Sequence, residues 1–137
     1  MFFVMKLQMY MTLLIVDGSD IIIQRLAFWI TESGSKNISA VHSAATYSQA
    51  IVLLREIKPD IVILDMYLAG HRSIDLIKVI KKNNKNASLI IFVNYADAAA
   101  KEKYEWAGAD FIFDKYNDFE KIPLAIDTIS KSILKII

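Results

Sequence analysis

The chain has 137 residues, a net charge of +1 at neutral pH, and a composition that is 55% hydrophobic and 23% charged. This length and composition are typical of one globular domain and argue against a disordered chain. The absence of cysteine excludes disulfides, thiol catalysis and thiolate metal sites, and the small net charge gives no reason to expect nucleic acid or an anionic membrane as a partner.

The N-terminal segment is apolar but does not have the pattern of a membrane anchor or a signal peptide. Lys6 and Gln8 interrupt it well before it reaches the roughly 20 apolar residues of a spanning helix. No small-residue cleavage site follows the run. We therefore expect residues 1–11 to be a short N-terminal extension, residues 12–137 to form one domain, and the protein to be cytoplasmic. The sequence leaves the role of the extension open.

Five short apolar runs recur along the chain, separated by the length of a strand plus a crossover helix. They are rich in Ile and Val and lack apolar/polar alternation, which is typical of parallel strands that are covered on both faces. The predicted strands are Leu13–Val16, Ile38–Val41, Ile61–Leu64, Leu89–Val93 and Phe111–Phe113.

The segments between these runs carry apolar residues at helical spacing. Pro59 is expected to end the second helix, Ser73 to cap the third, and Gly108 to follow the fourth. The predicted helical stripes run over residues 22–30, 47–57, 74–80, 98–107 and 122–136. Alternating strands and helices predict an α/β fold: a doubly wound, five-stranded parallel sheet with helices on both faces.

Polar residues stand where three of these strands end. Asp17 follows the first strand, Asp65 the third and Lys115 the fifth. Because ligands bind outside the carboxyl ends of the strands in such sheets, we expect the three side chains to converge there. Carboxylates suit Mg²⁺ and can attack phosphorus, and a lysine can neutralise a transferred phosphoryl group. The alternative is that both Asp side chains only cap loops or helices.

At this point the sequence resembles a response-regulator receiver domain, the phosphoacceptor module of two-component signalling, which has a flavodoxin-like fold. The matching segments are residues 14–17 (Leu-Ile-Val-Asp), 59–70 (Pro-Asp-Ile-Val-Ile-Leu-Asp-Met-Tyr-Leu-Ala-Gly), 107–110 (Ala-Gly-Ala-Asp) and 114–115 (Asp-Lys). The resemblance covers about Thr12 to Ile137. It implies that Asp65 is the phosphoacceptor and Lys115 the phosphate partner. It also implies that Asp17, Asp65 and the backbone carbonyl of Tyr67 hold Mg²⁺.

Several family positions are altered in this chain. Gly18 replaces the second of two consecutive acids, so Mg²⁺ affinity is expected to be weakened; Asp20 could compensate, although a helix-capping role fits it better. Val93 replaces the hydroxyl residue that ends strand four, and Ile112 replaces the aromatic residue of strand five. Tyr116 stands in place of the proline that commonly follows the lysine. We therefore expect an atypical receiver in which phosphorylation is weak or is coupled to output differently.

The expected function is that of a single-domain response regulator that signals by protein–protein contact. By resemblance, its partners are a sensor histidine kinase or phosphotransfer protein and an unknown protein effector. No nucleic acid or membrane partner is expected, and homodimerisation is left open. The protein is not expected to be an enzyme beyond self-phosphorylation from a phosphodonor and slow autodephosphorylation. Two alternatives remain: a phosphorylation-independent pseudo-receiver that acts as a binding module, and a small flavodoxin-like enzyme.

Overall fold

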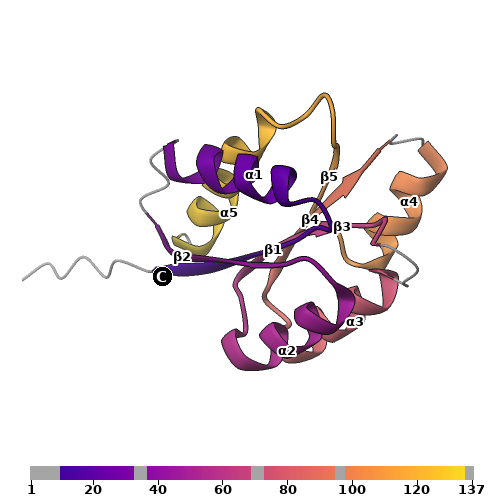
Figure 1. The fold of residues 1–137 in the computed structure, drawn as a ribbon, viewed down its shortest axis with the longest axis horizontal. Coiled ribbons are helices and arrows are strands. Elements are labelled where there is room, and N and C mark those ends of the chain that lie inside the picture. The colour runs from indigo at the N-terminus through magenta and orange to yellow at the C-terminus, as the bar shows by residue number, and fades with distance from the viewer. Residues whose placement is uncertain (1–9, 33–36, 69–72, 95–97, 135–137) are drawn as a thin grey trace, which may run out of the picture.

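The computed structural model describes residues 10–32, 37–68, 73–94 and 98–134, in which strands and helices alternate (Figure 1). The strands are β1 (Met11–Val16), β2 (Ile38–Ala44), β3 (Ile61–Asp65), β4 (Ser88–Val93) and β5 (Phe111–Asp114). The helices are α1 (Asp20–Glu32), α2 (Tyr47–Ile57), α3 (Ser73–Asn83), α4 (Ala98–Ala107) and α5 (Lys121–Leu134). Each predicted strand and helix is present, and β1 begins at the buried residue Met11. Residues 1–9 of the predicted extension lie outside the described residues.

The strands form one parallel sheet in the order β2-β1-β3-β4-β5. This confirms the predicted doubly wound sheet. The chain reverses its direction of winding between β1 and β3, so the carboxyl ends of these neighbouring strands flank the switch point where ligands bind in such folds. The residues that follow β1 and β3 are therefore placed beside each other by topology.

Two apolar layers fix the sheet between its helices. On one face, α1 and α5 pack through Leu26, Ile122 and Ile126 against inward-facing residues of the sheet. On the other face, the helices α2 and α3 contribute Leu54 and Leu76 to a second buried cluster. Because β3 and β4 are buried on both faces, their apolar runs lack alternation, as the sequence predicted.

The helix ends follow local rules with one exception. The side chain of Thr46 caps α2 by accepting a hydrogen bond from the Gln49 backbone N–H at 3.1 Å. The helix ends at Lys58, whose φ of 43° is left-handed. Gly108 follows α4 with a φ of 118°, as expected for a glycine at a helix end. Ser73 does not act as the predicted cap of α3: it is the first helical residue, and its buried Oγ has no hydrogen-bond partner among the described residues.

No helix in the described parts of the chain combines the length and the apolar character needed to cross a membrane.

Candidate functional site

The site is built from the residues that follow three parallel strands. Strand pairing continues one residue past each strand: the backbone N–H of Asp17 donates to the carbonyl of Ala44 at 3.0 Å, and that of Lys115 donates to the carbonyl of Val93 at 2.8 Å. These hydrogen bonds hold the backbone of the site on the same frame as the sheet. Asp65 is itself the last residue of β3.

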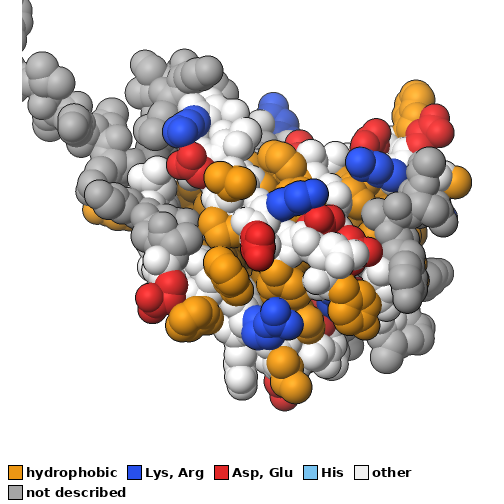
Figure 2. Space-filling view, turned by 90° about the horizontal axis from the view of Figure 1, so that it is seen from above, with side chains coloured by type: hydrophobic (Ala, Val, Ile, Leu, Met, Phe, Trp, Pro, Cys, Tyr) orange, Lys and Arg blue, Asp and Glu red, His pale blue; other side chains and the backbone are white. Residues whose placement is uncertain are grey.

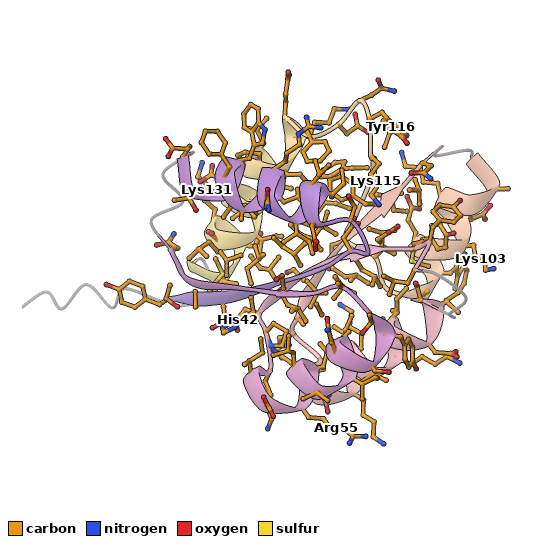
Figure 3. The ribbon with its side chains drawn as sticks, viewed as in Figure 1. His42, Arg55, Lys103, Lys115, Tyr116 and Lys131 are labelled. Atoms are coloured by element: carbon orange, nitrogen blue, oxygen red, sulfur yellow. The ribbon has the colours of Figure 1, made fainter. Side chains whose placement is uncertain are left out.

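The structure brings the three predicted side chains together. The Nζ atom of Lys115 lies 2.9 Å from Oδ2 of Asp17 and 2.9 Å from Oδ2 of Asp65. Asp17 and Asp65 are 1% and 4% exposed, so both carboxylates are buried. The Lys115 side chain comes from the segment after β5 and lies near the strand ends, whereas Tyr116 next to it is on the periphery (Figure 3). Two buried carboxylates thus share one ammonium group.

Each carboxylate is oriented by its own turn. Oδ1 of Asp17 accepts a hydrogen bond from the backbone N–H of Ser19 at 2.9 Å, and Oδ1 of Asp65 accepts one from the backbone N–H of Tyr67 at 2.9 Å. The second oxygen of each side chain faces Lys115. In the described structure, Oδ2 of Asp17 contacts the Lys115 ammonium group in this ion pair. The turns therefore leave one oxygen of each carboxylate directed at the shared site.

The electrostatics of the site oppose full ionisation. Burial raises the pKa of Asp17 and the nearby Asp65 carboxylate raises it further; Lys115 and the Ser19 N–H lower it but do not cancel the rise. For Lys115, burial lowers the pKa, but contacts with both carboxylates outweigh burial and leave the pKa raised. The ammonium group is therefore firmly charged, and the site carries excess negative charge that a cation would relieve.

The altered positions lie around this pair of acids. Gly18 is exposed beside Asp17, and a Cβ atom there would meet only the backbone oxygen of Ala45, at 3.8 Å. Val93 is fully buried at the end of β4. Ile112, on β5, is half-buried and packs against the cluster that covers the α2–α3 face. No hydroxyl or aromatic group occupies these last two positions.

Other residues near the site have less direct roles. Tyr67 supplies the N–H that orients Asp65, while its own side chain is 56% exposed. Asp20 is the first residue of α1, but Ser19 caps the helix, since its Oγ accepts from the Ile22 N–H at 3.4 Å. The favoured capping role of Asp20 is therefore wrong, and its charge instead lies in the first turn, where the helix dipole favours an acid.

Sequence reasoning missed the residues that hold the segment after β5. Oδ2 of Asp118 accepts a hydrogen bond from the backbone N–H of Asp114 at 2.7 Å, and the Asp118 N–H donates to the Asp114 carbonyl at 3.0 Å. The available signal in the sequence for this contact was a pair of Asp residues, four positions apart, that flank Lys115. Such spacing in a loop has no fixed meaning without the backbone conformation.

The oxygen atoms of the site suit a divalent cation. Within the described residues there is no cluster of three or more His, Cys, Asp or Glu side chains that could hold a metal ion. Two buried carboxylates remain, and among the described residues the buried Oδ2 atom of Asp17 has only the Lys115 ammonium group beside it. Hard oxygen donors of this kind fit Mg²⁺, which keeps several water ligands and needs only one or two protein carboxylates.

Comparisons with known proteins give a consistent result. A family model described as a response regulator receiver domain matches residues 13–127. The sensory transduction protein LytT of Enterococcus faecalis is 24% identical over 123 residues, which cover 90% of this chain and 49% of LytT. The chain thus spans about half the length of this curated relative.

Two solved structures share the fold at low sequence identity. The signal receiver domain of a DNA-binding response regulator from Colwellia psychrerythraea has a TM-score of 0.75 and 21% identity, with 90% of this chain and 98% of that chain covered. A response regulator from Burkholderia pseudomallei, solved with a phosphorylated aspartic acid, a calcium ion and citrate, has a TM-score of 0.74 and 22% identity, with 91% and 71% covered.

Proposed function

Since this chain belongs to the response regulator receiver domain family, we propose that Asp65 accepts a phosphoryl group and that the domain passes the signal on by protein–protein contact. Receivers of this family are signalling modules rather than metabolic enzymes, and they interact with histidine kinases or phosphotransfer proteins and with effectors. The single observation that carries the proposal is the placement of the Lys115 ammonium group 2.9 Å from both Asp17 and Asp65.

The chemistry follows from this geometry. A carboxylate oxygen of Asp65 attacks the phosphorus atom of a phosphohistidine; the new O–P bond forms as the P–N bond breaks, and the imidazole nitrogen keeps the electron pair. Lys115 neutralises the charge on the phosphoryl oxygens, because its ammonium group already lies beside the attacking carboxylate. The backbone N–H of Tyr67 holds the other oxygen and so fixes the direction of attack.

Receiver domains typically bind Mg²⁺ at the phosphorylation site, where the ion supplies additional charge neutralisation. In this chain, Asp17, Asp65 and the backbone carbonyl of Tyr67 are the proposed ligands. Gly18 supplies no carboxylate, so we propose that the affinity for Mg²⁺ is weak.

The route from phosphorylation to output is proposed to differ from that implied by the family resemblance. Val93 has no hydroxyl group to donate to a phosphoryl oxygen, and Ile112 has no aromatic ring to follow it. Phosphorylation at Asp65 must therefore act through the groups that contact it directly, chief among them Lys115.

Exposed hydrophobic side chains support the proposal that the domain receives or passes on its signal by contact with another protein. Ile21 and Phe28 on α1 are 69% and 63% exposed, and Leu124 on α5 is 68% exposed. Figure 2, which views the molecule from the side on which these two helices lie, shows hydrophobic side chains interspersed with charged ones. Burial of these side chains against a partner would remove apolar surface from water, which favours association.

The proposal is tested by the intact mass of the protein after incubation with acetyl phosphate and Mg²⁺. We expect one added phosphoryl group in the native chain and none in Asp65→Asn, which keeps the shape of the side chain and removes the nucleophile. If the native chain gains no phosphoryl group from acetyl phosphate or from a phosphohistidine donor, the domain is a binding module that works without phosphorylation.

A further inference from the structure

The segment between β5 and α5 is held closed by a pair of carboxylates. Asp114 and Asp118 form two mutual hydrogen bonds: Asp118 Oδ2 accepts from the Asp114 N–H at 2.7 Å, and the Asp118 N–H donates to the Asp114 carbonyl at 3.0 Å. Oδ1 of Asp114 also accepts from the N–H groups of Tyr116 and Asn117, at 2.8 and 3.0 Å. We call Asp114 and Asp118, with these hydrogen bonds, the carboxylate clasp.

The clasp is tied to two other elements of the fold. Oδ1 of Asp118 lies 2.9 Å from Nζ of Lys121, in the first turn of α5. The next residue, Phe119, is buried, and its ring centroid lies 5.4 Å from that of Phe92 on β4. The guanidinium group of Arg25 on α1 stands 4.5 Å from the centre of the Phe119 ring. The far end of the clasp is therefore anchored on α5, β4 and α1.

Lys115 lies inside the closed segment, immediately after Asp114. Its backbone is fixed on one side by the hydrogen bond to Val93 and on the other by the clasp. Tyr116, the residue after it, is 74% exposed and offers no packing that could hold the loop. A lysine side chain has four rotatable bonds, so a defined ammonium position depends on a defined backbone.

The charge on the clasp is also secured. Burial by itself raises the pKa of the Asp118 carboxyl, but the Asp114 N–H and Lys121 outweigh this effect, and the pKa is lowered below its usual value. Asp118 therefore stays ionised at neutral pH and accepts both contacts at full strength.

We propose that Asp118 is a positioning residue for Lys115: by closing the segment after β5 it sets the ammonium group between Asp17 and Asp65. The proposal rests on the phosphoacceptor function given above. The Asp118 carboxylate does not touch the reacting atoms. It instead controls the position from which Lys115 contacts the phosphoryl group.

The test compares Asp118→Ala with Asp118→Asn, which keeps an oxygen acceptor for the Asp114 N–H. Asp127→Ala is the matched control, because it removes an acid and its 2.9 Å ion pair with Lys131 on the same helix without touching the clasp. The first readout is the rate at which an amine-acylating reagent modifies Lys115, followed by peptide mass spectrometry in the unphosphorylated protein. The second is the rate of phosphorylation by acetyl phosphate, in the native and in the Lys115→Ala background.

Lys115 is 12% exposed and paired with two carboxylates, so it should be acylated slowly in the native chain. In Asp118→Ala we expect acylation to be several-fold faster and phosphorylation to be roughly tenfold slower, the scale of one lost charge-assisted hydrogen bond. Asp118→Asn should restore most of both rates, and Asp127→Ala should change neither. In the Lys115→Ala background, Asp118→Ala should have little further effect on phosphorylation, because the two changes act through one group.

Two results would overturn the proposal. One is an unchanged acylation rate of Lys115 in a folded Asp118→Ala protein, with folding checked by thermal unfolding. The other is an equal loss of phosphorylation rate with and without Lys115, which is the mark of general loosening. If the native chain takes up no phosphoryl group while acylation follows the expected pattern, the phosphoacceptor function fails and the positioning role stands.

Discussion

Gly18→Asp should restore tight binding of Mg²⁺ at the site. The position accepts a side chain, because a Cβ atom would meet only the Ala45 oxygen at 3.8 Å, and the φ angle of Gly18 is not left-handed. The new carboxylate would stand next to Asp17 at the same edge of the sheet. A third carboxylate would then be available to the cation, beside the proposed carbonyl ligand of Tyr67.

The size of the effect follows from Coulomb's law. A unit negative charge about 4 Å from a divalent cation in a solvated setting, which suits the exposed position of Gly18, contributes about 2 kcal/mol. That corresponds to roughly a thirtyfold lower Kd for Mg²⁺. Repulsion between the new carboxylate and Asp17 or Asp65 is present with and without the ion. It therefore lowers the stability of the metal-free fold and does not subtract from the gain in affinity.

Isothermal titration with MgCl₂ at constant ionic strength measures the change, with Gly18→Asn as a control of similar shape and no charge. We expect Gly18→Asp to bind Mg²⁺ much more tightly than Gly18→Asn does. The Mg²⁺ affinity of Gly18→Asn should be close to that of the native chain. An Asp variant that binds Mg²⁺ no more tightly than the Asn variant would refute the reasoning, since the extra charge would then have no access to the metal site.

Three further predictions concern stability. Val93→Thr should lower the free energy of unfolding of the unphosphorylated domain by about 1–2 kcal/mol, because it places a hydroxyl group at a fully buried position. Urea titration measures this change, and an unchanged midpoint would mean that the hydroxyl group finds a hydrogen-bond partner. Lys58→Gly should raise the free energy of unfolding by about 1 kcal/mol, because glycine adopts the φ of 43° without strain. A lower free energy of unfolding in this variant would contradict the prediction. The folded-state pKa of Asp118 is lowered, so its contribution to stability is present above its ordinary value near 3.8 and is lost as the pH falls through the folded value. Asp118→Asn should flatten this acid limb in thermal unfolding between about pH 5 and 2, and a limb as steep as that of the native chain would exclude Asp118 as its source.

Much of the fold follows from the sequence because the apolar runs have a direct physical meaning. The β3 segment is apolar without alternation, and it is buried on both faces in the structure. The convergence of Asp17 and Asp65 with Lys115 is predictable for the same reason, since the carboxyl ends of parallel strands share one edge of the sheet.

Other features depend on backbone conformation that side-chain patterns do not encode. Ser19, Asp20 and Ser73 are all residue types that favour helix caps, yet of these three only Ser19 has its side chain aligned with the N–H groups of a helix. Likewise, the clasp between Asp114 and Asp118 exists because the loop turns back on itself. No periodicity in the sequence reports that turn.

The central claim is that Asp65 becomes an acyl phosphate. The most direct measurement is borohydride reduction of the protein after exposure to a phosphodonor and Mg²⁺, followed by peptide mass spectrometry, because an aspartyl phosphate is reduced to homoserine while a free carboxylate is not. We predict homoserine at position 65, dependent on the phosphodonor and strongly reduced in Lys115→Ala. Homoserine at another acidic residue would contradict the account. So would the absence of homoserine at position 65 after prolonged incubation with a phosphohistidine donor.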